Sequence, residues 1–189
     1  MKSQIRRSLL FLCLSAAALT VGSAQQVVLP PDPQPPPPAS VISRVSAAKK
    51  VFLSNAGADR PFVQFISGGP NVAYNELYAS LKQWGYFQLV DSPSQADLIF
   101  EIRSSTVIHD YLEPGGNANI AKDITSTFTP IFTLSISEAT THFPVYSIVM
   151  PAGRGSNKAK GVIAFTQSIG VLTDKVKALV AAPAATQNP

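Results

Sequence analysis

Apolar residues recur at helical spacing in two parts of the chain. The first part has four of them at steps of four, four and three residues: Ala73, Leu77, Leu81 and Trp84. We expect this helix to begin at Pro70, because a first helical position does not need the N–H that proline lacks. It should end at about Trp84, since Gly85 can adopt the left-handed conformation that closes a helix at no steric cost.

The second helical pattern lies near the C-terminus. Six apolar residues follow one another at steps of three or four: Val162, Phe165, Ile169, Leu172, Val176 and Leu179. One apolar side of this kind predicts a helix that docks onto a sheet. A coiled-coil dimer is the alternative, but the stretch has fewer than three full heptads and contains Gly170. Residues 181–189 are small and polar, and we expect a disordered tail there.

Two stretches between these helices alternate apolar and polar residues, which is typical of strands with one buried face. The residues that we expect to point inward are Leu98, Phe100 and Ile102 in the first stretch, and Phe132, Leu134 and Ile136 in the second. Glu138–Thr141 predicts a turn, and Phe143–Met150 predicts a returning strand. Because Pro144 has no N–H to donate, this strand should lie at a sheet edge or begin late.

Shorter signals complete the expected order of elements. Lys49–Ser54 and Tyr86–Val90 are apolar and β-branched or aromatic enough for strands. Ser92–Gln95 has the pattern of a single helical turn capped by Ser92. Val41–Ala48 is either a short strand or an irregular lead-in.

Two regions are interpreted as long loops. Asn55–Pro70 is rich in glycine and carries an apolar patch, Pro61–Ile66, that could be an edge strand or a flap over the core. His109–Ser126 has no apolar period and is expected to be a mobile loop that is long enough to bind something. The fold class that follows is α/β (α+β), with a single mixed sheet of four or five strands and two helices packed on one face. This domain should span residues 41–180.

The N-terminus has the pattern of an export signal. Basic residues precede an apolar stretch from Leu9 to Leu19, and small residues end at Ala24, so residues 1–24 are expected to be a signal peptide cleaved before Gln25. The apolar stretch is too short to favour a retained transmembrane helix. Lipid attachment at Cys13 is disfavoured, because bulky residues precede it. Residues 25–40 are a proline-rich linker, interpreted as a stiff tether, with a ligand for a proline-binding groove as the alternative.

Removal of the leader changes the charge and cysteine arguments. Three of the 15 Lys and Arg residues lie in the leader, which leaves 12 against 11 acidic residues. A net charge near +1 gives no reason to expect nucleic acid as a partner. The single cysteine also leaves, so the mature chain has no thiol for a disulfide or a metal. The location that follows is periplasmic or secreted.

The sequence carries no recognisable catalytic motif, neither a G-x-S-x-G elbow nor an H-E-x-x-H pair. If the two alternating strands pair antiparallel, His109 and His142 lie at opposite ends of the ladder, too far apart to share a metal. His109, Asp110 and Glu113 could form a smaller site, but two histidines in solvent are the preferred interpretation. We therefore expect no catalytic, cofactor-binding or metal-binding residues and no cofactor.

The residues from Gly85 to Asp91 (GYFQLVD), from Ala96 to Ile102 (ADLIFEI) and the hairpin around Ser137–Thr141 resemble a known envelope module. It is the small α/β domain at the N-terminus of TolB, shared loosely by curli-secretion and lipopolysaccharide-assembly lipoproteins. The chain is also similar to uncharacterised exported bacterial proteins with the same Ala-Asp strand start. The resemblance implies this fold over roughly residues 49–180 and brings no catalytic residues with it. The chain lacks the TolB propeller and the lipid-bearing cysteine.

The function expected is that of a non-enzymatic exported cell-envelope module, protein-binding or structural, and monomeric or weakly oligomeric. Its partner would be an unknown envelope protein or a glycan. The candidate partner-binding edge has no charged residue to discourage strand pairing: Tyr146, Ser147, Ile148, Val149 and Met150. A competing expectation is that Phe62–Ile66 covers this edge. The alternative function is a small hydrolase that uses the 55–70 and 109–126 loops.

Overall fold

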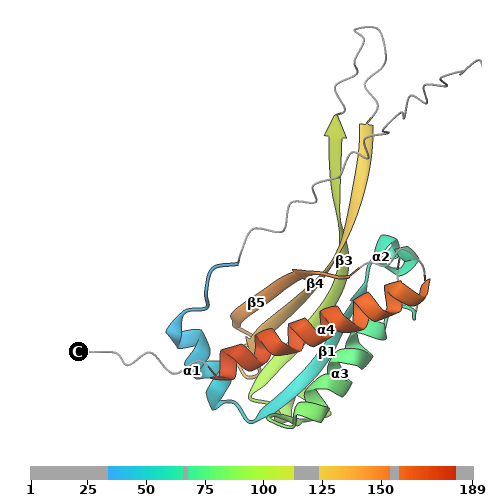
Figure 1. The fold of residues 1–189 in the computed structure, drawn as a ribbon. Coiled ribbons are helices and arrows are strands. Elements are labelled where there is room, and N and C mark those ends of the chain that lie inside the picture. The colour runs from blue at the N-terminus through green and yellow to red at the C-terminus, as the bar shows by residue number, and fades with distance from the viewer. Residues whose placement is uncertain (1–33, 66–67, 113–123, 154–157, 182–189) are drawn as a thin grey trace, which may run out of the picture. The chain divides into compact units, whose positions relative to one another are not determined.

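A computed structural model describes residues 34–65, 68–112, 124–153 and 158–181. Within these ranges the chain forms a five-stranded sheet in the order β2-β1-β3-β4-β5, with helices packed on one face (Figure 1). The strands are β1 Lys50–Ala58, β2 Gln88–Leu89, β3 Leu98–Leu112, β4 Ile124–Glu138 and β5 Pro144–Pro151. The helices are α1 Ala39–Ala47, α2 Arg60–Phe65, α3 Val72–Trp84 and α4 Lys158–Ala181, with a 3₁₀ turn at Pro93–Gln95. The single mixed sheet of the expected fold class is confirmed.

The connections explain why the sheet is mixed. β1 pairs parallel with both β2 and β3, and α3 provides the crossover that a parallel connection needs. β3, β4 and β5 are antiparallel, and a short turn joins β4 to β5. None of the helices in the described ranges is long and apolar enough to cross a membrane.

The core lies between the sheet and the helices. The inward residues expected from the alternation are all buried, and the register places Phe100 opposite Ile136 and Ile102 opposite Leu134. α3 covers this face with Ala73, Leu77 and Leu81, which are also buried. The alternation thus identified the correct face of both central strands.

α3 confirms the expected end of the helix and corrects its start. Gly85 has φ 71°, and its N–H donates to the carbonyl of Leu81 at 3.1 Å, which closes the helix as expected. The helix begins at Val72, after Asn71, and not at Pro70. Gly68 and Gly69 both have positive φ, so the chain is still turning when it reaches Pro70.

α4 docks onto the sheet through five of its six seam residues: Phe165, Ile169, Leu172, Val176 and Leu179. The expectation that Val162 shares this seam is wrong, because its side chain is 47% exposed. None of the residues 160–164 is buried, so this part of α4 contributes no side chain to the core. Periodicity identifies the side of a helix that faces the core, but not how far along the helix the core extends.

The segment Val41–Ala48 is helical as far as Ala47, which corrects the expected short strand or irregular lead-in. α1 buries Val41 and Val45 one turn apart, and Ala48 follows them. The N–H of Val41 donates to the carbonyl of Pro38 at 2.9 Å, so the helix starts directly after the prolines. β-branched residues have modest helix propensity, but burial against α4 stabilises the helical form.

The expected loop Asn55–Pro70 contains regular structure. β1 continues to Ala58, and Pro61–Phe65 belongs to α2, so the edge-strand alternative is wrong and the patch packs on the core as a helix. Ile66 lies outside the described residues. The Asp59 carboxylate accepts the N–H of Phe62 at 2.7 Å and thereby caps α2. The cap lets Phe62 become buried, 5.8 Å from the ring of Phe132.

The expected strand Tyr86–Val90 is shorter in the structure, where only Gln88 and Leu89 pair with β1. Tyr86 instead stacks on Trp84 with ring centroids 5.1 Å apart, which keeps the chain close to the end of α3. The single turn that follows is confirmed. Its cap, Ser92, accepts the N–H of Ser94 at 3.4 Å.

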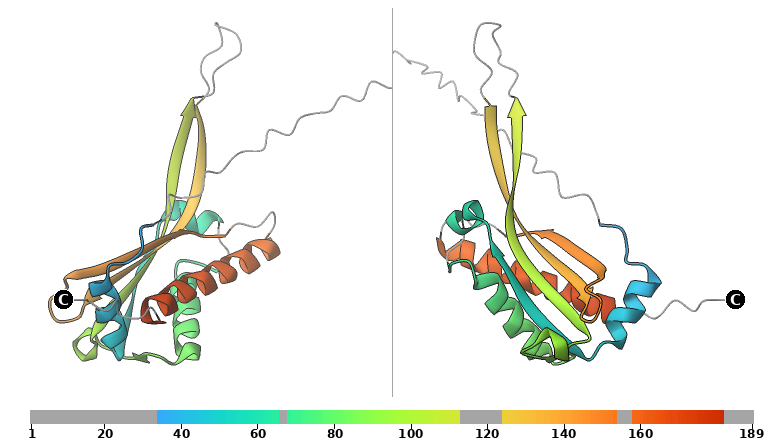
Figure 2. Two further views of the ribbon diagram at one scale, coloured as in Figure 1. Left: turned by 60° about the vertical axis from the view of Figure 1, so that its left-hand side comes forward. Right: turned by 180° about the vertical axis from the view of Figure 1, so that it is seen from behind.

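The expected loop His109–Ser126 begins and ends in strands. β3 and β4 stay paired out to Leu112 and Ile124, and only residues 113–123 lie outside the described ranges. β1 pairs with β3 no further than Ser104, and β5 pairs with β4 no further than Ile131, so the two strands continue beyond the rest of the sheet as a two-stranded ribbon (Figures 1 and 2). Its β-branched residues favour extended backbone despite the missing apolar period.

Candidate partner-binding edge

β5 is an edge strand whose one strand neighbour in the described sheet is β4. Of the two alternatives expected from Pro144, an edge position or a late start, the strand order shows the edge position, and the strand begins at Pro144 itself. The register pairs Tyr146 with Ile136, Ile148 with Leu134 and Met150 with Phe132. The opposite side of β5 pairs with no other strand of the described sheet.

The five candidate residues differ in what they present. Ile148 and Met150 are buried in the core, whereas Val149 is 45% exposed and Ser147 is partly exposed. The side chains of Ile148 and Met150 fix the strand to the core, and those of Ser147 and Val149 face outward. The groups that could pair with another strand are backbone N–H and carbonyl groups. In a strand, alternate residues direct their N–H and carbonyl groups to opposite sides, so Ser147 and Val149 share one side.

The side that Ser147 and Val149 share is occupied by one side chain, the amide of Gln34. The Gln34 amide nitrogen donates to the carbonyl of Ser147. The Val149 N–H donates to Gln34 Oε1 at 3.4 Å. The competing expectation for Phe62–Ile66 is corrected here, because Gln34 of the proline-rich linker meets this edge, whereas α2 contacts β3.

A second contact joins the linker to the edge. The Tyr146 hydroxyl donates to the carbonyl of Pro35 at 3.5 Å. Partial burial of this ring raises the pKa of Tyr146 above its usual value. Sequence reasoning missed the role of Gln34 altogether, because a glutamine among prolines carries no pattern that points to a strand 113 residues away.

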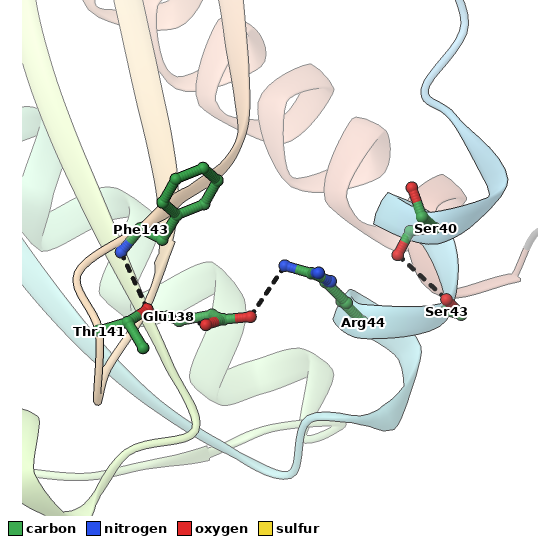
Figure 3. Close-up of polar contacts among 6 residues, drawn as sticks. All are labelled: Ser40, Ser43, Arg44, Glu138, Thr141 and Phe143. Atoms are coloured by element: carbon green, nitrogen blue, oxygen red, sulfur yellow. Dashed lines mark hydrogen bonds and ion pairs between the residues drawn. The ribbon is translucent and has the colours of Figure 1, made fainter.

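The turn before β5 is held to α1 by polar contacts (Figure 3). Arg44 of α1 points at Glu138 and forms an ion pair of 2.8 Å with it. Glu138 also accepts the Thr141 hydroxyl at 2.8 Å, and that hydroxyl accepts the N–H of Phe143 at 3.2 Å. These contacts position the start of β5 and keep α1, with the linker before it, close to the same strand.

The Ala96-Asp97 strand start has a structural role. One carboxylate oxygen of Asp97 accepts the N–H groups of both Lys49 and Lys50 at 2.8 Å. These two hydrogen bonds hold the pKa of Asp97 below its usual range. The backbone of Asp97 also bonds Lys50 and Ala139, so the residue joins the starts of β1 and β3 to the β4–β5 turn.

The two histidines considered for chemistry are far apart in the described part of the chain. His109 pairs with Thr127 on the ribbon, while His142 lies in the turn beyond Glu138, so the two histidines are at opposite ends of the β3–β4 ladder as expected. Glu113 lies outside the described residues. Among the described residues, no group of three or more His, Cys, Asp or Glu side chains is placed to hold a metal.

A hollow of about 540 Å³ lies between α3 and α4, and none of its lining residues belongs to the segments considered for a hydrolase. It is lined by Ser80, Gln83, Trp84, Gly170, Thr173, Asp174 and Lys177. Its acidic and basic members, Asp174 and Lys177, pair with each other at 2.9 Å on the surface of α4. An exposed ion pair of this kind is a common feature of helix surfaces and has little energetic weight.

The chain matches no protein-family model and no curated protein sequence. Several solved structures resemble it at low identity. A putative neuraminyllactose-binding hemagglutinin homolog from Helicobacter pylori has 13% identity and a TM-score of 0.36, with 69% of this chain and 85% of that chain covered. A Xanthomonas campestris protein of the DUF330 family has 11% identity and a TM-score of 0.38, with 68% and 81% covered. LpoB from E. coli has 12% identity and a TM-score of 0.33, with 80% and 89% covered. Similarity at this level carries no functional argument.

Proposed function

We propose that this protein is a non-enzymatic cell-envelope module that binds an extended segment of another protein by strand addition to β5. The main support for the proposal is that no strand of the described sheet pairs with the outer side of β5. β5 has strand pairing on one side, and the hydrogen-bonding groups of Ser147 and Val149 on the other side are met by a side chain instead of a strand. An added strand would form a backbone ladder at the same place.

The composition of β5 supports the proposal. Edge strands are usually protected by charged side chains, bulges or coverage, because an unprotected edge pairs with other chains. The stretch from Phe143 to Met150 has no Lys, Arg, Asp or Glu, and Phe143 is 63% exposed at its start. Backbone bonds would supply affinity, and the outward side chain of Val149 would contribute to specificity.

The envelope location is part of the proposal and rests on the leader sequence. Cleavage after Ala24 would leave Gln25 as the first residue of the exported protein. Intact-mass measurement of protein recovered from the periplasm or medium should give the mass of the chain from Gln25. A mass that includes Cys13 with an added lipid would contradict the assignment.

Site-specific crosslinking tests the docking edge. A photo-reactive amino acid at Val149 of the exported protein should give a discrete adduct with another envelope protein. The matched control is the same group at Val171, which is 49% exposed on α4 and therefore equally accessible. Adducts of the same kind and yield from both positions would mean that β5 is not a docking site.

A backbone variant separates strand pairing from side-chain contact. Ser147→Pro removes an N–H on the open side of β5, where an edge strand can accept proline. The crosslink from Val149 should disappear in this variant, whereas Ser147→Ala, which keeps the N–H, should retain it. Thermal melts of both variants check that the fold persists. An undiminished adduct in Ser147→Pro would refute strand addition.

A further inference from the structure

We infer that residues Gln34–Pro38, called the cover segment from here on, are a displaceable cover of the β5 edge, and that an incoming strand must replace the Gln34 side chain to bind. The inference rests on the proposed function and adds its regulation. The cover segment precedes α1 directly and contacts β5 at Ser147, Val149 and Tyr146.

The Gln34 amide has the hydrogen-bonding groups that a strand would supply at this edge. A glutamine side chain offers a donor and an acceptor on the same group, as a backbone amide does. Here the donor meets the carbonyl of Ser147 and the acceptor meets the N–H of Val149. These two groups lie on one side of β5 and are those that an added strand would bond. Gln34 therefore satisfies in the free protein the positions that a partner needs.

The rest of the cover segment consists of prolines. Pro35, Pro36, Pro37 and Pro38 have no N–H, so their backbone cannot donate to β5 and cannot extend the pairing into a ladder. Proline-rich chain is nonetheless extended, with a rise per residue close to that of a strand. The cover segment can thus lie along the edge without becoming part of the sheet, which makes it weak enough to be displaced.

α1 holds the cover segment close to β5. α1 follows it at once and is anchored by the buried side chains of Val41 and Val45 and by the Arg44–Glu138 ion pair (Figure 3). Tethering of this kind gives Gln34 a high effective concentration at β5. Release of the edge needs only the cover segment to detach, while α1 and the sheet remain folded.

The consequence is protection combined with control. A covered edge does not pair indiscriminately with other chains, which is the hazard of an uncharged edge strand. A partner that binds must offer a segment whose backbone forms more hydrogen bonds with β5 than the cover segment can.

Amide hydrogen exchange of the full mature chain tests the cover directly. The exchange of the Val149 amide should become roughly five-fold faster in Gln34→Ala, as expected for the loss of one hydrogen bond. Gln34→Glu keeps the size of the side chain but replaces the donor by a carboxylate oxygen. Because this oxygen repels the Ser147 carbonyl, the side chain should leave the edge, and Val149 exchange should become faster here too. Gln167→Ala, an exposed glutamine on α4, is the matched control and should leave Val149 unchanged.

The amide of Leu134, in the middle of the sheet, serves as an internal reference and should exchange at one rate in all variants. An unchanged rate at Val149 in both Gln34 variants would overturn the inference, because the Gln34 side chain would then not occupy the edge. A rise at both Val149 and Leu134 would also overturn it, since it would indicate general loosening of the sheet.

Crosslinking from Val149 then tests displacement. If a partner competes with the cover segment, the adduct yield should rise several-fold in Gln34→Ala and stay at the wild-type level in Gln167→Ala. An adduct of unchanged yield in Gln34→Ala would overturn the inference while the proposed function stands. If no adduct forms in any variant although Val149 exchange rises in Gln34→Ala, the proposed function and the displacement step both fail.

Discussion

Phe165→Ala should lower the free energy of unfolding by about 3–5 kcal/mol, the range for removing a buried aromatic ring. The Phe165 side chain is 2% exposed, and its ring lies 5.1 Å from that of Phe132 at an interplanar angle of 82°. Such an edge-to-face pair adds about 0.5–1.5 kcal/mol to the effect of burial alone. Phe132 in turn contacts Phe62, so truncation would leave a cavity where α4, β4 and α2 meet.

Urea unfolding followed by circular dichroism would measure this change, and a thermal melt should show a midpoint lowered by roughly 6–20 °C for a domain of this size. The matched control is Val162→Ala, on the same helix but outside its buried seam. Because Val162 is 47% exposed, this variant should stay within about 0.5 kcal/mol of the wild type. Equal losses in both variants, or no loss in Phe165→Ala, would refute the docking of α4 that the structure shows.

Three further predictions test other parts of the structure. The hydrogen bonds that lower the pKa of Asp97 stabilise the fold above the ordinary carboxyl pKa of 3.8, and this contribution disappears as the pH falls through the folded-state pKa. Asp97→Asn should therefore flatten the acid limb of a stability–pH profile, and an unchanged limb would contradict this. Gly153→Ala should cost about 1–3 kcal/mol in urea unfolding, because its Cβ would lie 2.4 Å from a backbone oxygen of α4. Gly170→Ala has open space and should stabilise the helix by up to about 1 kcal/mol, and the reverse order of stabilities would contradict the packing. Arg44→Ala should cost less than about 1 kcal/mol in a thermal melt, since both side chains of its pair with Glu138 are partly exposed, and a larger loss would indicate a further role for Arg44.

The elements that sequence analysis located correctly are those in which burial leaves a regular trace. α3, the buried part of α4 and the inward faces of β3 and β4 follow the periods of helix and strand, because one side of each element faces the same core. The end of α3 was predictable for a different reason, since Gly85 is the residue that a left-handed cap favours.

The errors occurred where the local signal was weak or misleading. α1 and α2 are short, α1 follows a run of prolines and α2 contains Pro61, and both are helical because Val45 and Phe62 are buried against other elements. The ribbon of β3 and β4 has no apolar period, and its strands extend by pairing with each other. In each case a contact distant in sequence outweighed the propensity of the segment.

For the candidate site, the sequence alone identified an uncharged strand with a proline near its start and left an edge position or a late start as alternatives, because residue type and alternation are local properties. The strand order of the structure decides for the edge. Only the tertiary structure shows that Gln34 bonds Ser147 and Val149. A hydrogen bond between a side chain in one segment and the backbone of another leaves no periodic pattern. It exists because α1 folds beside β5 and carries the residues before it to the open edge.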